Sequence, residues 1–125
     1  MKIHQLSLAI DKQLFLNSFA KVQSTLFGHT SRPIPPSSYW VHILNVFDHV
    51  EKELFLIEED GAFIARISVN STQRDPNIAF FGMLEYPKDR LDICNQLLNS
   101  AKEWAKNKLK KTIFGPIDLN VWMNN

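Results

Sequence analysis

The sequence contains one cysteine, four glycines and no apolar run close to the length of a membrane span. A single cysteine, Cys94, excludes an internal disulfide and a zinc site built from several cysteines. Crossing a bilayer takes about 20 consecutive apolar residues, and no stretch approaches that length. The apolar stretch after Met1 to Gln5 is too short for a secretory signal and has no small-residue cleavage site. We therefore expect a cytoplasmic protein that has no contact with a membrane.

An excess of charge of either sign is also nearly absent. The formal net charge is +1 at neutral pH, which gives no electrostatic reason to expect nucleic acid as the main partner. Four lysines do crowd the stretch from Lys106 to Lys111. Such a cluster is more typical of a solvated helix end, where cations suit the helix dipole. Nucleic-acid binding is therefore the weakest of the functional hypotheses.

What the sequence does have is enough apolar material for one core. It has 125 residues, of which 45% are hydrophobic and 22% charged, an ordinary balance for a folded protein. Apolar residues recur at strand and helix spacings along the chain. These observations predict a single domain over residues 1–125.

The spacings predict the order strand, helix, helix, three strands, helix, strand. The expected elements are a strand over 2–10, a helix over 11–27, an irregular proline-rich segment over 29–36, a helix that begins at Ser37 or Ser38, strands over 53–58, 63–70 and 78–84, a helix that begins at Pro87 or Asp89, and a strand over 112–119. Three consecutive strands favour an antiparallel meander. The fold class is therefore α/β (α+β), with a mostly antiparallel mixed sheet flanked by helices.

Local patterns refine these elements. Asp60-Gly61 between two apolar runs is the strongest short hairpin signal. In the strand after it, alternation places Phe63, Ala65, Ile67 and Val69 on one face and Ile64, Arg66 and Ser68 on the other. The helix after residue 37 has a stripe formed by Trp40, Ile43, Leu44 and Phe47. The last helix is expected to bury Ile93, Cys94, Leu97, Leu98, Ala101, Trp104 and Ala105.

An ordered set of short pieces resembles the GNAT-type acyl-CoA N-acyltransferase fold, in a poorly characterised bacterial branch. The pieces are Leu54-Phe55-Leu56 before Asp60-Gly61, Ala65-Arg66-Ile67, Phe80-Phe81-Gly82-Met83-Leu84-Glu85, Leu97-Leu98, Ala101, Glu103-Trp104-Ala105 and Gly115-Pro116. They cover roughly residues 53–120, and the N-terminal third matches only in the order of its elements. The resemblance is therefore to the N-terminal part of that fold.

The resemblance implies transfer of an acyl group from acyl-CoA, acetyl-CoA for example, to an amine on a small molecule or a protein, without a metal. Acyl-CoA would lie across the strand end at Met83 and Leu84. The resemblance places its phosphates near the following turn, at Lys88, Asp89, Arg90 and Leu91. Glu85, at the end of that strand, is the candidate general base. The alternative for Glu85 is a solvent-facing carboxylate with no chemical role, and the sequence favours this interpretation.

Two features depart from the family pattern. The family binds pyrophosphate on glycine-rich backbone, whereas the turn from Tyr86 to Arg90 contains no glycine and Pro87 removes a donor. Lys88 and Arg90 would attract phosphate there, and Asp89 would repel it. The family fold also continues with a helix and two strands after Gly115-Pro116. We therefore expect the chain to lack the C-terminal helix and strands, as half of a domain completed by another copy or as a shortened or inactive form.

Other polar residues favour structural roles. Arg66 is expected to point to solvent or to pair with Glu58 across the hairpin. His42 and His49 are two helical turns apart, about 10 Å, too far to share a metal ion. Cys94 lies on the buried stripe of the last helix, where packing is a commoner role than nucleophilic attack.

Unpartnered apolar surface predicts a homodimer. Trp122 and Met123 follow the last strand, where each would otherwise expose considerable apolar area. The strand over 112–119 would also leave an open sheet edge, and such edges tend to be covered or paired. The competing hypothesis to the transferase is therefore a non-catalytic, homodimeric α/β protein-interaction module.

Overall fold

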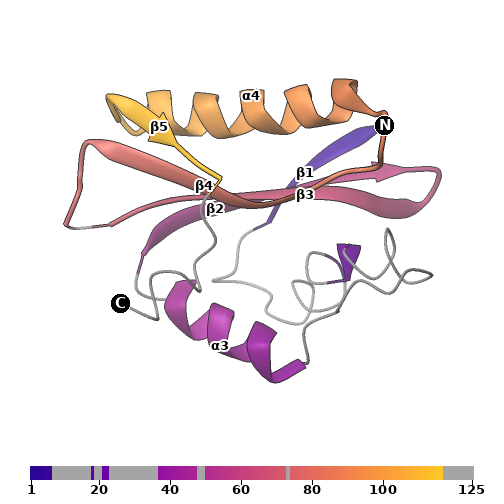
Figure 1. The fold of residues 1–125 in the computed structure, drawn as a ribbon, viewed down its shortest axis with the longest axis horizontal. Coiled ribbons are helices and arrows are strands. Elements are labelled where there is room, and N and C mark those ends of the chain that lie inside the picture. Colours follow the sequence, from indigo (N-terminus) through magenta and orange to yellow (C-terminus); the bar gives the residue numbers. More distant parts are fainter. Residues whose placement is uncertain (7–17, 19–20, 23–36, 48–49, 73, 117–125) are drawn as a thin grey trace.

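The structure is a computed structural model that describes residues 1–6, 18, 21–22, 37–47, 50–72 and 74–116. Its described elements form two helices and one sheet (Figure 1). They are β1 (Lys2–Leu6), α3 (Ser37–Phe47), β2 (Glu51–Glu59), β3 (Ala62–Ser71), β4 (Ile78–Glu85), α4 (Leu91–Asn107) and β5 (Thr112–Phe114). Neither of these two helices is long and apolar enough to cross a membrane.

The five strands form one sheet in the order β1-β2-β3-β4-β5. The first four strands pair antiparallel, and β5 pairs parallel with β4. Helix α4 lies across one face of the sheet and α3 lies under the other (Figure 1). The predicted α/β (α+β) class, with a mostly antiparallel mixed sheet between helices, is confirmed.

The hairpin between β2 and β3 follows its sequence signal. Asp60 and Gly61 both have positive φ, at 53° and 81°, which is the backbone of a two-residue type I′ turn. Glu59 pairs with Ala62 across it, so the turn contains only these two residues. Aspartate and glycine are among the residues that adopt this conformation at least cost.

The alternation predicted for β3 is wrong at its first two residues. The register shifts between Ile57 and Glu58, so that Ile57 pairs with Ala65 while Glu58 pairs with Phe63. Ile64 is the extra residue of a β-bulge, and such an insertion reverses the faces of the residues before it. Phe63 therefore contacts His4 on the α3 side, with ring centroids 5.5 Å apart. Ile64 packs instead on the α4 side.

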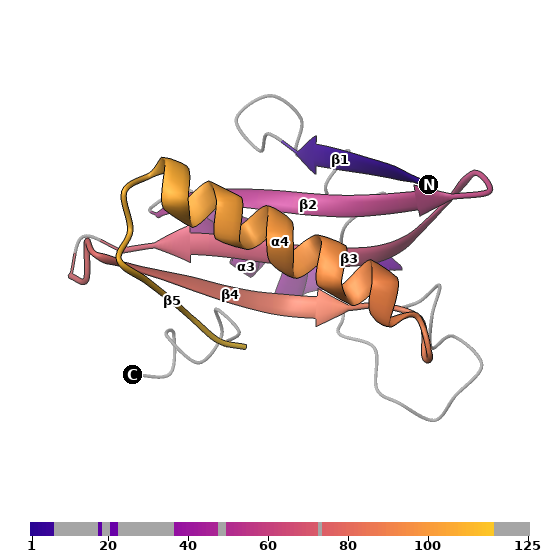
Figure 2. The same ribbon diagram turned by 90° about the horizontal axis from the view of Figure 1, so that it is seen from above.

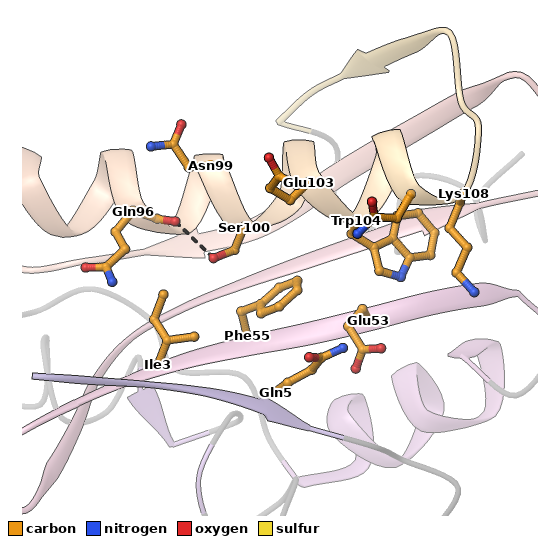
Figure 3. Close-up of a pocket in the computed structure, with 11 residues that line it drawn as sticks. Ile3, Gln5, Glu53, Phe55, Gln96, Asn99, Ser100, Glu103, Trp104 and Lys108 are labelled. Atoms are coloured by element: carbon orange, nitrogen blue, oxygen red, sulfur yellow. Dashed lines mark hydrogen bonds between the residues drawn. The ribbon is translucent and has the colours of Figure 1, made fainter.

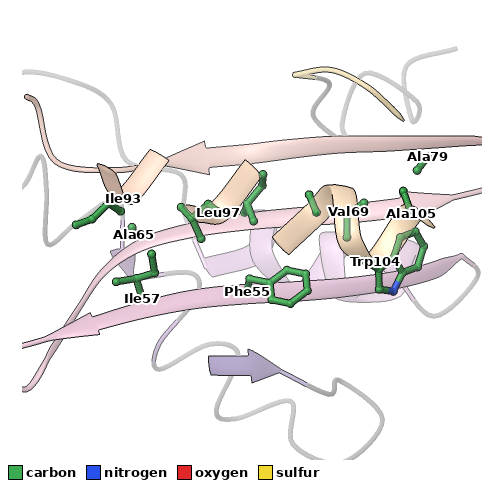
Figure 4. Close-up of a cluster of buried hydrophobic side chains, with 11 residues drawn as sticks. Phe55, Ile57, Ala65, Val69, Ala79, Ile93, Leu97, Trp104 and Ala105 are labelled. Atoms are coloured by element: carbon green, nitrogen blue, oxygen red, sulfur yellow. The ribbon is translucent and has the colours of Figure 1, made fainter. Parts of the chain in front are cut away.

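The main core lies between the sheet and α4, which carries its apolar residues on one stripe (Figure 4). Apart from the half-buried Leu98, every residue expected on that stripe is buried. The cluster comprises Phe55, Ile57, Ala65, Ile67, Val69, Ala79, Ile93, Leu97, Ala101, Trp104 and Ala105. The seam between the helix and the central strands therefore carries much of the apolar burial that holds this fold together.

Helix α4 begins at Leu91, later than the predicted start at Pro87 or Asp89. Asp89 has a φ of 66°, a left-handed conformation that cannot continue into a right-handed helix. Arg90 is the N-cap residue. The residues between β4 and α4 therefore form an irregular turn, and the helix begins two to four residues later than the sequence indicates.

The face of the sheet toward α3 combines apolar and buried polar side chains. Trp40 and Ile43, two residues of the predicted stripe, are buried there. Arg66, Ser68 and Asn70 alternate along β3 on this face and are only 3%, 1% and 2% exposed. Buried polar groups normally have hydrogen-bond partners. In the described part of the chain, the side-chain nitrogen of Asn70 is the exception.

Several predicted segments lie outside the described residues. Most of the first helix, predicted over 11–27, is among them, and only Ser18, Lys21 and Val22 of it are described. The others are the proline-rich segment over 29–36, the last part of the first strand (7–10), the last part of the final strand (117–119), and residues 120–125 with Trp122 and Met123. Predictions that rest on them stay predictions.

Candidate functional site

Strands β4 and β5 run side by side for only three residue pairs. Ile78 pairs with Thr112, Ala79 with Ile113, and Phe80 with Phe114. Strand β4 then continues to Glu85, whereas β5 ends at Phe114 and diverges from β4 (Figure 2). The far half of β4 therefore has β3 on one side and no β5 on the other.

Gly115 lies at the point where the two strands separate. A Cβ atom at this position would overlap the backbone carbonyl oxygen of Phe81 and lie 2.8 Å from its ring. Real Cβ atoms do not approach backbone oxygens this closely, so only glycine fits here without movement of β5. The position of the divergence is thus fixed by a backbone contact.

The far half of β4 contains a bulge. Ser68 pairs with Gly82 and Arg66 pairs with Glu85, so two residues of β4 lie opposite one residue of β3. Met83, inside this interval, has a φ of 53°, which is uncommon for a residue other than glycine. The bulge lies directly beside the divergence from β5.

Side chains of β3 bind the carbonyl groups of the bulge. The Ser68 hydroxyl donates to the carbonyl oxygen of Gly82 at 3.1 Å, and the Arg66 Nε donates to that of Met83 at 3.1 Å. In a trans peptide the N–H group points opposite to the carbonyl group. The N–H groups of Met83 and Leu84 therefore both point away from β3, toward the side on which β5 has ended.

The structure corrects the first of the two expectations for Arg66, that its side chain points to solvent. Its guanidinium lies in a buried slot, 4.9 Å from the centre of the Trp40 ring, where a cation–π contact holds it. Arg66 is directly opposite Glu85 in the register, so the two side chains share the α3 face of the sheet. Glu58, the partner expected from the sequence, binds the ring nitrogen Nε2 of His4 at 2.8 Å.

Arg90 joins the turn after β4 to the β2–β3 hairpin. Its two terminal nitrogens each donate to one oxygen of Glu59 at 2.9 Å, a bidentate pair, and its guanidinium also contacts Asp92 at 3.1 and 3.2 Å. Hydrogen bonds from Arg90 lower the pKa of the Glu59 carboxyl and that of Asp92. The same contacts raise the pKa of Arg90. Much of the hydrogen-bonding capacity of this guanidinium is therefore used within the chain.

The N-terminus of α4 carries its own anion. Asp92 in the first turn binds the Arg90 guanidinium, and the backbone N–H groups beside it also help to lower its pKa. Negative charge is favoured at this end of a helix dipole. Lys88, Asp89 and Leu91, the other predicted phosphate-binding residues, are exposed beside it. Lys88 is thus the exposed cation of this turn.

Tyr86, which follows the candidate base, was not singled out by the sequence. It is half-buried against the main core, and a hydrogen bond with Cys94 raises the pKa of its hydroxyl. Cys94 is itself buried on the α4 stripe. This contact joins the first residue of the turn to α4, and no residue pattern in the sequence pairs this tyrosine with this cysteine.

Two grooves lie away from the β4–β5 divergence. One, of about 570 Å³, lies between α4 and the edge formed by β1 and β2, and Figure 3 shows the side chains that converge on it. It is lined by Ile3, Gln5, Glu53, Phe55, Gln96, Asn99, Ser100, Glu103, Trp104, Asn107 and Lys108. The other, of about 350 Å³, contains Lys102, Lys106, Lys110 and Lys111 at the end of α4 far from Lys88. Neither groove contains a predicted site residue.

Metal-binding side chains do not gather in the described part of the chain. No three histidine, cysteine, aspartate or glutamate residues there lie close enough to hold a metal ion. His42 is exposed on α3, and His49 lies outside the described residues.

Comparisons by sequence give no match: no family model and no curated protein matches this chain. Comparison with solved structures does find similar proteins. A putative GNAT family acetyltransferase from Staphylococcus aureus superposes with a TM-score of 0.66 at 18% identity, over 92% of this chain and 99% of that chain. An aminoglycoside acetyltransferase from an uncultured soil metagenomic sample, in complex with sisomicin, gives 0.65 at 14% identity, over 98% and 82%.

A third similar structure is AAC(6′)-Iy in complex with the bisubstrate analogue CoA-S-monomethyl-acetylneamine. It superposes with a TM-score of 0.66 at 12% identity, over 98% of this chain and 83% of that chain. Identities this low establish the fold alone. The chain therefore has the fold of the GNAT acetyltransferases, as the sequence resemblance implies.

Proposed function

We propose that this protein is an acyl-CoA-dependent N-acyltransferase. The observation that carries the proposal is the bulge in β4 beside the point where β5 separates. There the N–H group of Leu84 points away from β3, toward the side on which β5 has ended. An N–H group held in place by the strand is the kind of donor that stabilises negative charge developing on a thioester oxygen. The likeness to acetyltransferase structures supports the same reaction class.

In the proposed reaction, the thioester carbonyl of acyl-CoA accepts a hydrogen bond from the β4 backbone at Met83 and Leu84. The nitrogen of a neutral amine attacks the carbonyl carbon, and the carbonyl electron pair moves onto oxygen. Glu85 accepts the proton released from the amine. The oxyanion then collapses, the carbon–sulfur bond breaks, and CoA leaves as a thiolate that takes up a proton. The products are an amide and free CoA.

The phosphate groups of acyl-CoA are placed by this proposal over the turn that includes Lys88, Asp89, Arg90 and Leu91. Lys88 supplies the positive charge, since Arg90 already binds two carboxylates. Asp92 adds a negative charge in the first turn of α4. The turn therefore offers fewer donors than a glycine-rich loop, and we expect the phosphates to contribute less to affinity than they do on such a loop. The acceptor is an amine, and a cytoplasmic location would give access to acyl-CoA.

Ligand binding tests the proposal directly. Acetyl-CoA and a longer acyl-CoA should raise the melting temperature of the protein, since a ligand at 100 times its dissociation constant adds about 2.7 kcal/mol to stability. Desulfo-CoA should give a smaller shift, because it lacks the acyl group that binds β4. No shift with any of these ligands at millimolar concentration would contradict the proposal.

The alternative is a non-catalytic homodimeric module that retains the scaffold. The ion pairs that Arg90 forms at the turn favour this alternative, because a guanidinium already paired with carboxylates attracts phosphate less strongly. It predicts a stable dimer whose melting temperature is the same with and without acyl-CoA. The thermal measurement therefore separates the two functions.

A further inference from the structure

We propose that Arg66 and Ser68 are positioning residues that hold the β4 bulge in the form that binds the acyl donor. This inference rests on the proposed function, and it assigns to two buried side chains of β3 a role in the site. Both lie outside β4 and outside the turn after it. Neither touches the substrate in this proposal.

The first step is the loss of regular pairing at the bulge. In a regular antiparallel strand, successive carbonyl groups point to opposite sides, so only every second one faces a given neighbour. Here two successive carbonyl groups, those of Gly82 and Met83, are both bound from β3. A regular strand cannot place both on that side. The left-handed conformation of Met83 makes the arrangement geometrically accessible.

The second step is that side chains of β3 donate to both of these carbonyl groups. A left-handed residue other than glycine persists only where surrounding contacts compensate for its backbone cost. The Ser68 hydroxyl and the Arg66 guanidinium are such contacts, at 3.1 Å each. A buried carbonyl group left without a donor is costly, so removal of either side chain would favour a return to ordinary pairing.

The third step concerns rigidity. Ser68 is 1% exposed and Arg66 is 3% exposed, so water does not replace either donor readily. The Trp40 ring lies 4.9 Å from the Arg66 guanidinium and links α3 to the same point. A planar guanidinium in such a slot has a fixed orientation, which a lysine ammonium would not reproduce. The bulge is therefore fixed from the α3 face, while its N–H groups point toward the opposite neighbour.

The test compares serine variants on the same strand. Ser68→Ala removes the donor to Gly82. The matched control is Ser71→Ala, since Ser71 is also buried on β3 but its hydroxyl donates to Glu51, away from the bulge. Ser68→Ala should weaken acetyl-CoA binding by about threefold to tenfold, the usual range for one lost hydrogen bond. Ser71→Ala should leave the affinity unchanged.

A second measurement detects the bulge itself. In two-dimensional ¹⁵N–¹H spectra, the amide signals of Met83 and Leu84 should move in Ser68→Ala and in Arg66→Lys, and stay in place in Ser71→Ala. Ser68→Thr, which keeps the hydroxyl, should restore both the signals and the affinity. If Ser68→Ala does not fold, Arg66→Lys and Ser68→Thr against wild type make the same comparison.

The outcomes separate this inference from the proposed function. Wild-type protein that binds acetyl-CoA, with Ser68→Ala and Arg66→Lys binding it equally well and unchanged Met83 and Leu84 signals, would overturn the positioning role and leave the function intact. Wild-type protein that does not bind acetyl-CoA would overturn the proposed function, and the binding role of these residues with it. Equal losses of acetyl-CoA affinity in Ser68→Ala and Ser71→Ala would show that Ser68 contributes only to general stability, and would overturn the inference.

Discussion

Glu85 ends β4 and shares the α3 face with the buried Arg66. In the proposed reaction it is the general base. Replacement by glutamine keeps its size and removes its ability to accept a proton as a base. We expect Glu85→Gln to bind acetyl-CoA within about twofold of wild type and to lower transfer by about 10²–10⁴, the usual contribution of a general base. Release of CoA thiol from acetyl-CoA with a panel of primary amines measures the rate.

Glu58→Gln is the matched control for this change. Glu58 is also a half-buried strand carboxylate, but it binds His4 on β1 and lies on another strand. Its replacement should leave transfer unchanged. Equal rates in wild type and Glu85→Gln would show that Glu85 has only the solvent-facing role that the sequence favours.

At the scale of single residues, the sequence indicated where β4 ends but did not indicate the buried Arg66 on the α3 face beside it. Glu85 could be placed because an apolar run ends there. The burial of Arg66 could not be predicted, because arginine is rarely buried and its slot is formed by Trp40, which is distant in sequence. The hydrogen bond between Tyr86 and Cys94 is of the same kind.

At the scale of elements, Arg90 connects the start of α4 to the hairpin of β2 and β3. The pKa values of Glu59 and Asp92 are lowered by its hydrogen bonds from their ordinary values of 4.5 and 3.8. A carboxyl group with a lowered pKa in the folded protein adds stability above its ordinary pKa, and this stability is lost as the pH falls through the lowered value. We therefore expect the junction to weaken below about pH 4.

The measurement is the urea midpoint at pH 6 and at pH 3. Arg90→Ala should lower the urea midpoint at pH 6. Its midpoint should fall less than that of wild type between pH 6 and pH 3, since Glu59 and Asp92 no longer have the ion pair that protonation would break. The effect is small because the side chains are partly exposed. Arg74→Ala, an exposed arginine in the β3–β4 turn, is the control and should follow wild type. Identical acid losses in Arg90→Ala and wild type would contradict this account.

Element types were more predictable than their irregularities. The stripe of α4 and the Asp60-Gly61 turn follow from periodicity and local backbone preference, which depend on neighbouring residues only. The two bulges do not, because a one-residue slip in pairing depends on contacts with another strand. The start of α4 was misplaced for a related reason: Pro87 and Asp89 are ordinary start signals, and the left-handed Asp89 overrides them.

At the scale of the whole molecule, we predict a homodimer. The prediction rests on Trp122, Met123 and the edge strand over 112–119, of which the structure describes only β5. Phe114 on β5 is 59% exposed, which adds apolar surface at the same edge. Sedimentation should give the mass of two 14.5-kDa chains, and removal of residues 120–125 should give one. A mass unchanged by this deletion would place the contact elsewhere.

Gly115 has a consequence for how freely this chain can vary. Because its α-carbon lies against the Phe81 carbonyl with no room for a methyl group, every L-amino acid there would push the last strand outward. The separation of β5 from β4 at this point would then increase, although no residue of β4 had changed. The spacing of these two strands thus depends on a residue without a side chain, which has no part in the proposed reaction.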